Sequence, residues 1–230
     1  MPDTQTPEAR VVRAALELAA ERPWGEVALV DIAARSRITL SDLRRHFGSK
    51  AAIVAAFART IDDELLKEAR PHTDGASPRD RVFEVVMARF DRLQPHRAAL
   101  RSIHGAGLAE PVLMRAVLES QAWMLNAAGV ATDGLGGGVR VAGLASVYAS
   151  VFATWLDDDD PGLARTMAAL DRRLRRGERT LGSLEEVAGV VKRIGALFVP
   201  WGSGGPASRA DTAASSDHPA AGPAAPAPGP

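Results

Sequence analysis

The stretch from Leu29 to Lys50 reads LVDIAARSRITLSDLRRHFGSK, and its pattern predicts two short helices joined by a tight turn. Ile32 gives the first helix a small apolar face. Leu43 and Phe47 are four residues apart, so they share one face of the second helix and can pack onto the first. The opposite face of that helix is centred on Arg45. A short helix, a turn and a second helix with basic side chains outward form the helix-turn-helix pattern.

The net charge of the chain is zero, so it gives no overall attraction for DNA. The chain carries 28 Lys and Arg against 28 Asp and Glu, so any affinity for DNA must come from a local patch. Between Arg35 and Lys50 there are five cations and one anion, Asp42. The carboxylate of Asp42 should repel phosphates and reduce affinity, but the local balance still favours DNA.

A family resemblance rests on the segment from Arg10 to Lys50. With DIA at residues 31–33 and LRRHFGSK at residues 43–50, it resembles the DNA-binding domain of TetR-type regulators. This family usually has Gly in the turn, where this chain has Arg37. It usually has Thr and Tyr on either side of the leucine of the second helix, where this chain has Asp42 and Arg44. The resemblance implies a homodimer that binds a double-stranded DNA operator. The residues expected to contact DNA are Thr39, Ser41, Arg44, Arg45, His46 and Lys50.

The composition argues against catalysis and against metal or cofactor chemistry. The absence of cysteine excludes thiol catalysis, disulfides and cysteine-ligated zinc, and it fits a cytoplasmic protein. The histidines form no HExxH pattern, and no GxSxG, Rossmann or Walker motif is present. The acidic run at residues 157–160 precedes a proline, so it indicates a helix start more than a metal site. We therefore expect no catalytic residue, metal site or cofactor.

Helical periodicity without strand-like alternation predicts an all-α fold. Residues 71–78, PHTDGASP, form a linker, so we expect a helix-turn-helix domain with its linking helix at 7–70 and a helical ligand-binding and dimerisation domain at 78–201. Residues 202–230 are rich in Gly, Ala and Pro and are expected to be a disordered tail. Within the second domain, residues 132–138, TDGLGGG, are expected to be a loop, and Gly177 is expected to end a helix.

Aromatic and methionine residues follow the helical spacing of the second domain. Each alone is most simply a core residue, but together, on helices that resemble those around the TetR ligand cavity, they favour a ligand site. The expected ligand-binding residues are Phe83, Met87, Phe90, Trp123, Tyr148, Phe152 and Trp155. No buried charged partner is evident, so the expected ligand is an apolar small molecule or a lipid. Small residues such as Gly143 and Ala149 predict a dimer interface on the helix at 139–156 or on the segment after Gly162.

A second resemblance leaves another function open. Residues 81–101 and 155–176 resemble the lipid-binding proteins of ubiquinone biosynthesis, which share the TetR fold and do not act as repressors. This resemblance implies an accessory protein that binds isoprenoid lipids without binding DNA. It also implies membrane contact by a terminal amphipathic helix, here residues 184–201. The leading prediction is a ligand-responsive DNA-binding regulator, and the lipid-binding protein is the alternative.

Overall fold

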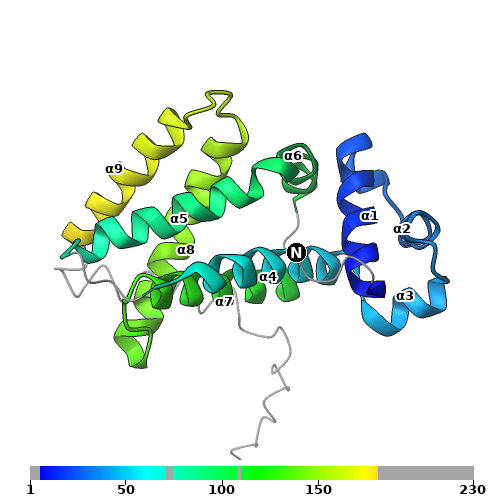
Figure 1. The fold of residues 1–230 in the computed structure, drawn as a ribbon, viewed down its shortest axis with the longest axis horizontal. Coiled ribbons are helices and arrows are strands. Elements are labelled where there is room, and N and C mark those ends of the chain that lie inside the picture. The colour runs from blue at the N-terminus through cyan, green and yellow to red at the C-terminus, as the bar shows by residue number, and fades with distance from the viewer. Residues whose placement is uncertain (1–5, 71–74, 108–109, 181–230) are drawn as a thin grey trace, which may run out of the picture. The chain divides into compact units, whose positions relative to one another are not determined.

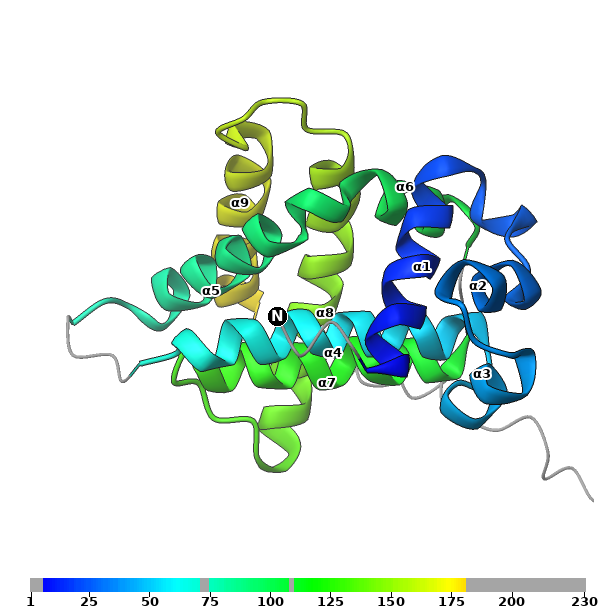
Figure 2. The same cartoon turned by 45° about the vertical axis from the view of Figure 1, so that its right-hand side comes forward.

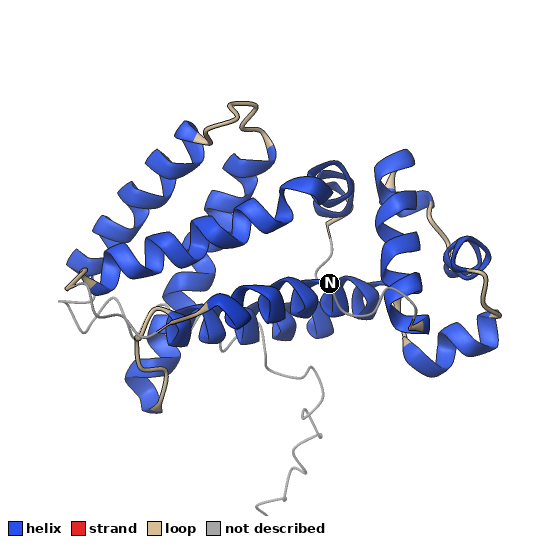
Figure 3. Cartoon of the chain, in the orientation of Figure 1, coloured by secondary structure: helices blue, strands red, loops and turns tan. Residues whose placement is uncertain are grey.

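The computed structural model describes residues 6–70, 75–107 and 110–180 (Figure 1). Every regular element in these ranges is helical, as Figure 3 shows, so the all-helical prediction is confirmed. The elements in chain order are α1 (Pro7–Glu21), η1 (Trp24–Glu26), α2 (Leu29–Ser36), α3 (Leu40–His46), α4 (Lys50–Glu68), α5 (Pro78–Leu93), η2 (Gln94–His96), α6 (Arg97–Gly105), α7 (Pro111–Ala127), α8 (Gly134–Leu156) and α9 (Ala164–Thr180).

Helices α1 to α3 form what we call the head. Their starts are set by hydroxyl side chains, since Thr6 caps α1, Thr39 caps α3, and Ser49 caps α4 directly after the head. The apolar faces of the three helices meet around fully buried side chains. These include Val11, Trp24, Ile32 and Leu43. Burying this apolar surface holds α2 against α1 and α3 against α2, which fixes the outward face of α3.

Helices α4 to α9 form what we call the body. Helix α4 lies along α7 in both views (Figures 1 and 2), and α5 and α8 both pack against α7 and α9. Phe90, Trp155 and Leu170 are fully buried at the centre of these contacts. Helix α6 packs on α1, which connects the body to the head.

Two expectations about glycines are wrong. The segment at 132–138 is not a loop throughout, because α8 already begins at Gly134. A side chain at Gly137 would place its Cβ 2.0 Å from the Thr132 carbonyl carbon, so this glycine permits a close approach of the backbone. Gly177 does not end its helix either, since α9 continues to Thr180. A glycine inside a helix costs only about 1 kcal/mol, which the surrounding turns can offset.

Helix α8 is the one described helix that is long and apolar enough to cross a membrane by length and composition, and core helices of soluble proteins pass the same test. Only 33% of its apolar window is buried, so much of α8 is available for further contacts. The amphipathic segment predicted at 184–201 and the tail predicted at 202–230 lie outside the described residues.

Candidate nucleic-acid interface

The turn between α2 and α3 is set by one residue in a left-handed conformation. Arg37 has φ 57° and ψ 44°, and its amide donates to the carbonyls of Ala33 and Ala34 at the end of α2. The Ser36 hydroxyl donates to the Ile32 carbonyl at 2.7 Å and is buried with it. The left-handed residue stands where TetR-type sequences usually have Gly, which explains that preference physically. The chain adopts the helix-turn-helix geometry despite the arginine.

A chain of hydrogen bonds organises the first turn of α3. The Thr39 hydroxyl oxygen accepts from the Asp42 amide at 3.0 Å, and the hydroxyl donates to Asp42 Oδ2 at 2.6 Å. The other carboxylate oxygen of Asp42 accepts from the Arg45 guanidinium. The Thr39 hydroxyl, and after it Arg45, lower the pKa of the Asp42 carboxyl. Asp42 is therefore an ionised carboxylate whose charge is offset by a neighbouring arginine rather than an isolated anion.

The residues expected to contact DNA lie in two settings. Thr39, Ser41, Arg44, Arg45 and His46 are all exposed on or beside α3. The Arg45 side chain is 73% exposed, although it is paired with a carboxylate. His46 Nδ1 lies 2.7 Å from a carboxylate oxygen of Glu8 on α1. The outward face of α3 is therefore basic, and two of its side chains are already held by partners within the head.

Lys50, the remaining expected contact, is half-buried at the start of α4. Its ammonium group donates to the carbonyls of Trp24 and Val27 at 2.7 Å each, and it lies 4.7 Å from the centre of the Trp24 ring. Burial lowers the pKa of Lys50, and the charge of Glu110 opposes that shift. Two of its three N–H donors thus stabilise the segment between α1 and α2.

Sequence reasoning missed two polar links between the body and the head. The Trp24 amide donates to the Ser102 hydroxyl oxygen at 2.9 Å across 78 residues, and that hydroxyl donates to the Arg22 carbonyl at 3.2 Å. The Ser49 hydroxyl donates to a Glu110 carboxylate oxygen at 3.2 Å. Nothing in the local sequence around Ser102 or Glu110 distinguishes them from other surface polar residues. These contacts place α6 against the segment before α2, and the start of α7 against the start of α4.

The expected ligand-binding residues divide into four rings in mutual contact, of which Phe152 is partly buried and the others buried, and three residues outside this group. Phe90, Tyr148, Phe152 and Trp155 form stacked or tilted ring pairs with centroids 5.2–6.5 Å apart. We call these four the aromatic cluster. The other three lie toward the surface: Phe83 and Met87 are partly buried against the core, and Trp123 is 55% exposed. The structure therefore brings together four of the seven residues.

A buried ion pair lies beside the aromatic cluster. Arg89 Nε donates to Asp62 Oδ1 at 2.8 Å, the Ser120 hydroxyl donates to the same oxygen at 2.9 Å, and Arg89 also donates to the Tyr148 hydroxyl. Burial would lower the pKa of Arg89, but Tyr148 and Asp62 raise it further than burial lowers it, and burial raises the pKa of Tyr148. The expectation that the body holds no buried charged partner is therefore wrong.

The sequence did contain a signal for this pair. Arg89 belongs to the buried set Val82, Val86, Arg89 and Leu93, whose spacing follows one helical face. A charged residue at an apolar position of such a face requires a partner, because an unpaired buried charge is costly. That partner, Asp62, is 27 residues away on α4 and could not be identified from spacing alone.

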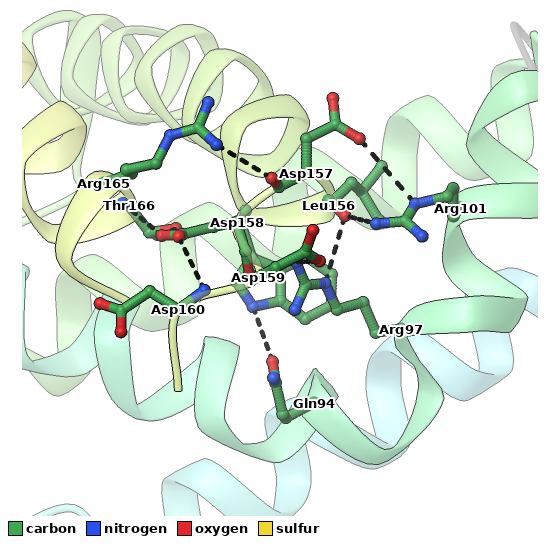
Figure 4. Close-up of polar contacts among 11 residues, drawn as sticks. Gln94, Arg97, Arg101, Leu156, Asp157, Asp158, Asp159, Asp160, Arg165 and Thr166 are labelled. Carbon is green, nitrogen blue, oxygen red and sulfur yellow. Dashed lines mark hydrogen bonds and ion pairs between the residues drawn. The ribbon is translucent and has the colours of Figure 1, made fainter. Parts of the chain in front are cut away.

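The acidic run before α9 has two roles (Figure 4): Asp157 and Asp159 form ion pairs with Arg101 and Arg97 of α6, whereas Asp158 and Asp160 accept hydrogen bonds at the start of α9. Asp158 is fully buried, and its Oδ2 accepts from the Thr166 amide at 2.8 Å and the Thr166 hydroxyl at 2.7 Å. Asp160 accepts from the Ala164 amide at 2.9 Å. Burial opposes ionisation of Asp158, but these hydrogen bonds lower its pKa. Within the described ranges, no three His, Asp or Glu side chains are grouped so as to hold a metal ion.

Comparison with known proteins supports both resemblances. Residues 11–57 match the family model of bacterial regulatory proteins of the tetR family, and residues 140–180 match the COQ9 model. No curated protein matches the chain. The chain thus resembles TetR-type regulators through its head and a ubiquinone-biosynthesis family through α8 and α9.

Solved structures of TetR regulators share the fold. One from Nitrosomonas europaea ATCC 19718 is 26% identical, with a TM-score of 0.58, over 76% of this chain and 99% of its own. One from Rhodococcus sp. RHA1 is 20% identical, with a TM-score of 0.59, over 74% and 94%. One from Streptomyces coelicolor is 19% identical, with a TM-score of 0.53, over 83% and 88%. Together they establish that the chain has the TetR fold.

Proposed function

We propose that the protein is a ligand-responsive, cytoplasmic DNA-binding regulator of the TetR type that acts as a repressor. The observation that carries this proposal is the geometry of α2, the turn at Arg37 and α3, which leaves a basic face of α3 exposed. Helix-turn-helix proteins insert such a second helix into the major groove. The family match over residues 11–57 supports the same function.

The proposed contacts follow from where the side chains lie. Arg45 faces the groove, while Arg44 and His46 contact the phosphate backbone from the exposed side of α3. Lys50 supports the fold with two donors and directs its third toward a phosphate. Thr39 and Ser41 lie at the start of α3, where recognition helices approach base edges.

A dimer is part of the proposal, because one helix-turn-helix reads too few bases alone. Helix α8 presents Ser146, Ala149 and Ala153 on its exposed side, and these small side chains permit close approach of another helix. Changing Ala149→Glu should yield monomers, since two carboxylates would face each other near a two-fold axis. Sedimentation should show a dimer for the unmodified protein and a monomer for the variant at micromolar concentration. A monomeric unmodified protein would contradict the proposal.

The proposed ligand is an apolar small molecule or lipid that contacts the aromatic cluster in the body. We keep the division into a DNA-binding domain at 7–70, a ligand-binding and dimerisation domain at 78–201 and a tail at 202–230 as part of this proposal. Helix α6 would carry the response to the head, because Ser102 is bonded to the backbone on both sides of Pro23. A shift of α6 would therefore move the start of α2.

The deciding experiment is a genome-wide pulldown followed by gel-shift assays on the recovered duplexes. The full chain should retain a small set of sequences with two-fold symmetry, and Arg45→Ala should lose them. Arg172→Ala, which removes the same charge from an exposed position on α9, is the matched control and should bind like the unmodified chain. If no duplex is enriched, the regulator proposal fails.

The alternative is a lipid-binding accessory protein of ubiquinone biosynthesis that does not bind DNA. The match of residues 140–180 to the COQ9 model favours it. Organic extraction of the purified protein followed by mass spectrometry distinguishes the two functions. An isoprenoid lipid at near-stoichiometric amount, together with no DNA enrichment, would support the alternative.

A further inference from the structure

The two arginines at the centre of α3 differ in how they are held. Arg44 and Arg45 are both exposed, but the structure pairs Arg45 with Asp42 at the preceding turn. Asp42 is itself held through its other oxygen by Thr39, at 2.6 Å. Thr39 is fixed in turn because its hydroxyl oxygen accepts a hydrogen bond from the Asp42 amide. The guanidinium of Arg45 is therefore oriented before any partner binds, through a chain of contacts within one helical turn.

An arginine oriented in this way is better suited to a base than to a phosphate. The nearby carboxylate weakens its attraction for a phosphate, whereas among the described residues no ion pair involves Arg44. A held side chain loses less rotamer freedom on binding, which favours one defined contact. The remaining donors of the planar guanidinium match two adjacent acceptors. In the major groove, guanine offers N7 and O6 as such a pair, while adenine offers one acceptor and one donor.

Asp42 adds a second preference in the same direction. Its carboxylate is ionised and 37% exposed, so it accepts hydrogen bonds and repels other acceptors. At a base edge it favours the N4 amino group of cytosine and disfavours thymine O4. A G·C base pair satisfies both side chains, since guanine presents acceptors to Arg45 and cytosine presents a donor to Asp42.

We infer that Thr39, Asp42 and Arg45 act as one unit that selects a G·C pair in each half-site of the operator: Arg45 contacts guanine, and Asp42 both orients Arg45 and accepts from the cytosine amino group. This inference rests on the proposed function, because it requires that α3 enters the major groove. It gives Asp42 a role in specificity, so this departure from the usual family sequence changes which operator is bound. Arg44 then provides a contact that is independent of sequence.

The test is selection of binding sites from a pool of random duplexes with the full chain. We expect one G·C pair to be enriched at a fixed place in each half-site. Arg45→Ala should remove that preference and weaken the selected site about tenfold to hundredfold, as expected for a bidentate base contact. Asp42→Asn should keep or raise affinity for random DNA while broadening the preference at that pair. Arg44→Ala is the control and should weaken all duplexes alike without changing the preferred base.

A change of one atom in the selected guanine then tests the contact directly. Replacing the selected guanine with 7-deazaguanine removes the N7 acceptor but keeps the base pair. The unmodified protein should lose affinity for this duplex, whereas Arg45→Ala should bind both duplexes equally. Thermal unfolding of each variant shows that the head remains folded.

The failure modes are distinct. Selected sites without a G·C preference, or a preference that survives Asp42→Asn unchanged, would overturn the inference while leaving the regulator proposal intact. Retention of no duplex by the unmodified chain would overturn both.

Discussion

The molecule contains two aspartate–arginine pairs whose environments are opposite. Asp42 and Arg45 lie three residues apart on α3, and their side chains are 37% and 73% exposed. Asp62 and Arg89 come from α4 and α5, 27 residues apart, and their side chains are 9% and 7% exposed. The exposed pair leaves donors of Arg45 open to water, so on the proposed function they can bind DNA while Asp42 still holds the guanidinium. The buried pair cannot, because Ser120 and Tyr148 complete a network from which water is largely excluded.

The comparison shows that the same two side chains serve different purposes according to burial. An exposed pair contributes little to stability, so it is free to change for recognition. A buried pair is costly to break and holds four helices in one arrangement, α4, α5, α7 and α8. The buried ion pair therefore supports the packing of the body, whereas the proposed role of the exposed ion pair is to orient an arginine for DNA.

The largest effect should follow from breaking the buried pair. Arg89→Met keeps most of the side-chain volume but leaves Asp62 with an uncompensated buried charge, which should lower the free energy of unfolding by about 3–5 kcal/mol. Arg45→Met makes the same change at an exposed site and should leave the unfolding midpoint unchanged. Urea unfolding followed by circular dichroism measures both.

A double variant separates the ion pair from the packing around it. Asp62→Leu combined with Arg89→Met removes both charges and should recover most of the lost stability, because no charge is left unpaired. If Arg89→Met destabilises the protein no more than Arg45→Met does, burial does not control the contribution of these pairs and the comparison fails.

An intermediate effect is expected at Lys50, which is half-buried at the start of α4, against the head. Lys50→Met keeps the aliphatic stem over Trp24 but leaves the carbonyls of Trp24 and Val27 without their donor, at a cost of about 1–3 kcal/mol. Urea unfolding should show this loss in the absence of DNA. Arg44→Met, which removes an exposed charge from α3, is the control and should not change stability. A Lys50 variant with full stability and weaker DNA binding would mean that its role lies with phosphate alone.

Sequence reasoning succeeded where the physical cause is local. The spacing of Ile32, Leu43 and Phe47 predicted the helix-turn-helix, and the proline after the acidic run predicted that a helix follows, which begins three residues later at Ala164. These signals span a few residues, so the sequence displays them directly. The start of α8 could not be predicted in the same way, because the glycines that suggest a loop are needed instead for the close approach of Gly137 to Thr132.

The remaining features depend on contacts between distant segments. Ser102 and Trp24 meet across 78 residues, and Asp62 meets Arg89 across 27. A single sequence shows that Arg89 occupies an apolar position but not which residue neutralises it. The position of Trp123 on the exposed side of α7 depends likewise on how the helices pack. Tertiary packing therefore decided the parts of the candidate site that local patterns left open.

The smallest effect should occur at the turn of the head, where backbone conformation rather than a partner sets the cost. Arg37 adopts φ 57°, a conformation that is unfavourable for a residue with a Cβ and accessible to glycine. Arg37→Gly should therefore raise the free energy of unfolding by about 0.5–1 kcal/mol, with the gain reduced by the greater freedom of glycine in the unfolded chain. Arg59→Gly is the matched control, because Arg59 is exposed within α4 and its variant should lose about 1 kcal/mol. If urea unfolding shows a higher free energy of unfolding for Arg37→Gly and a lower one for Arg59→Gly, the left-handed turn is a strained part of the head. Equal losses at both positions would show instead that the arginine at the turn is held by contacts stronger than the strain.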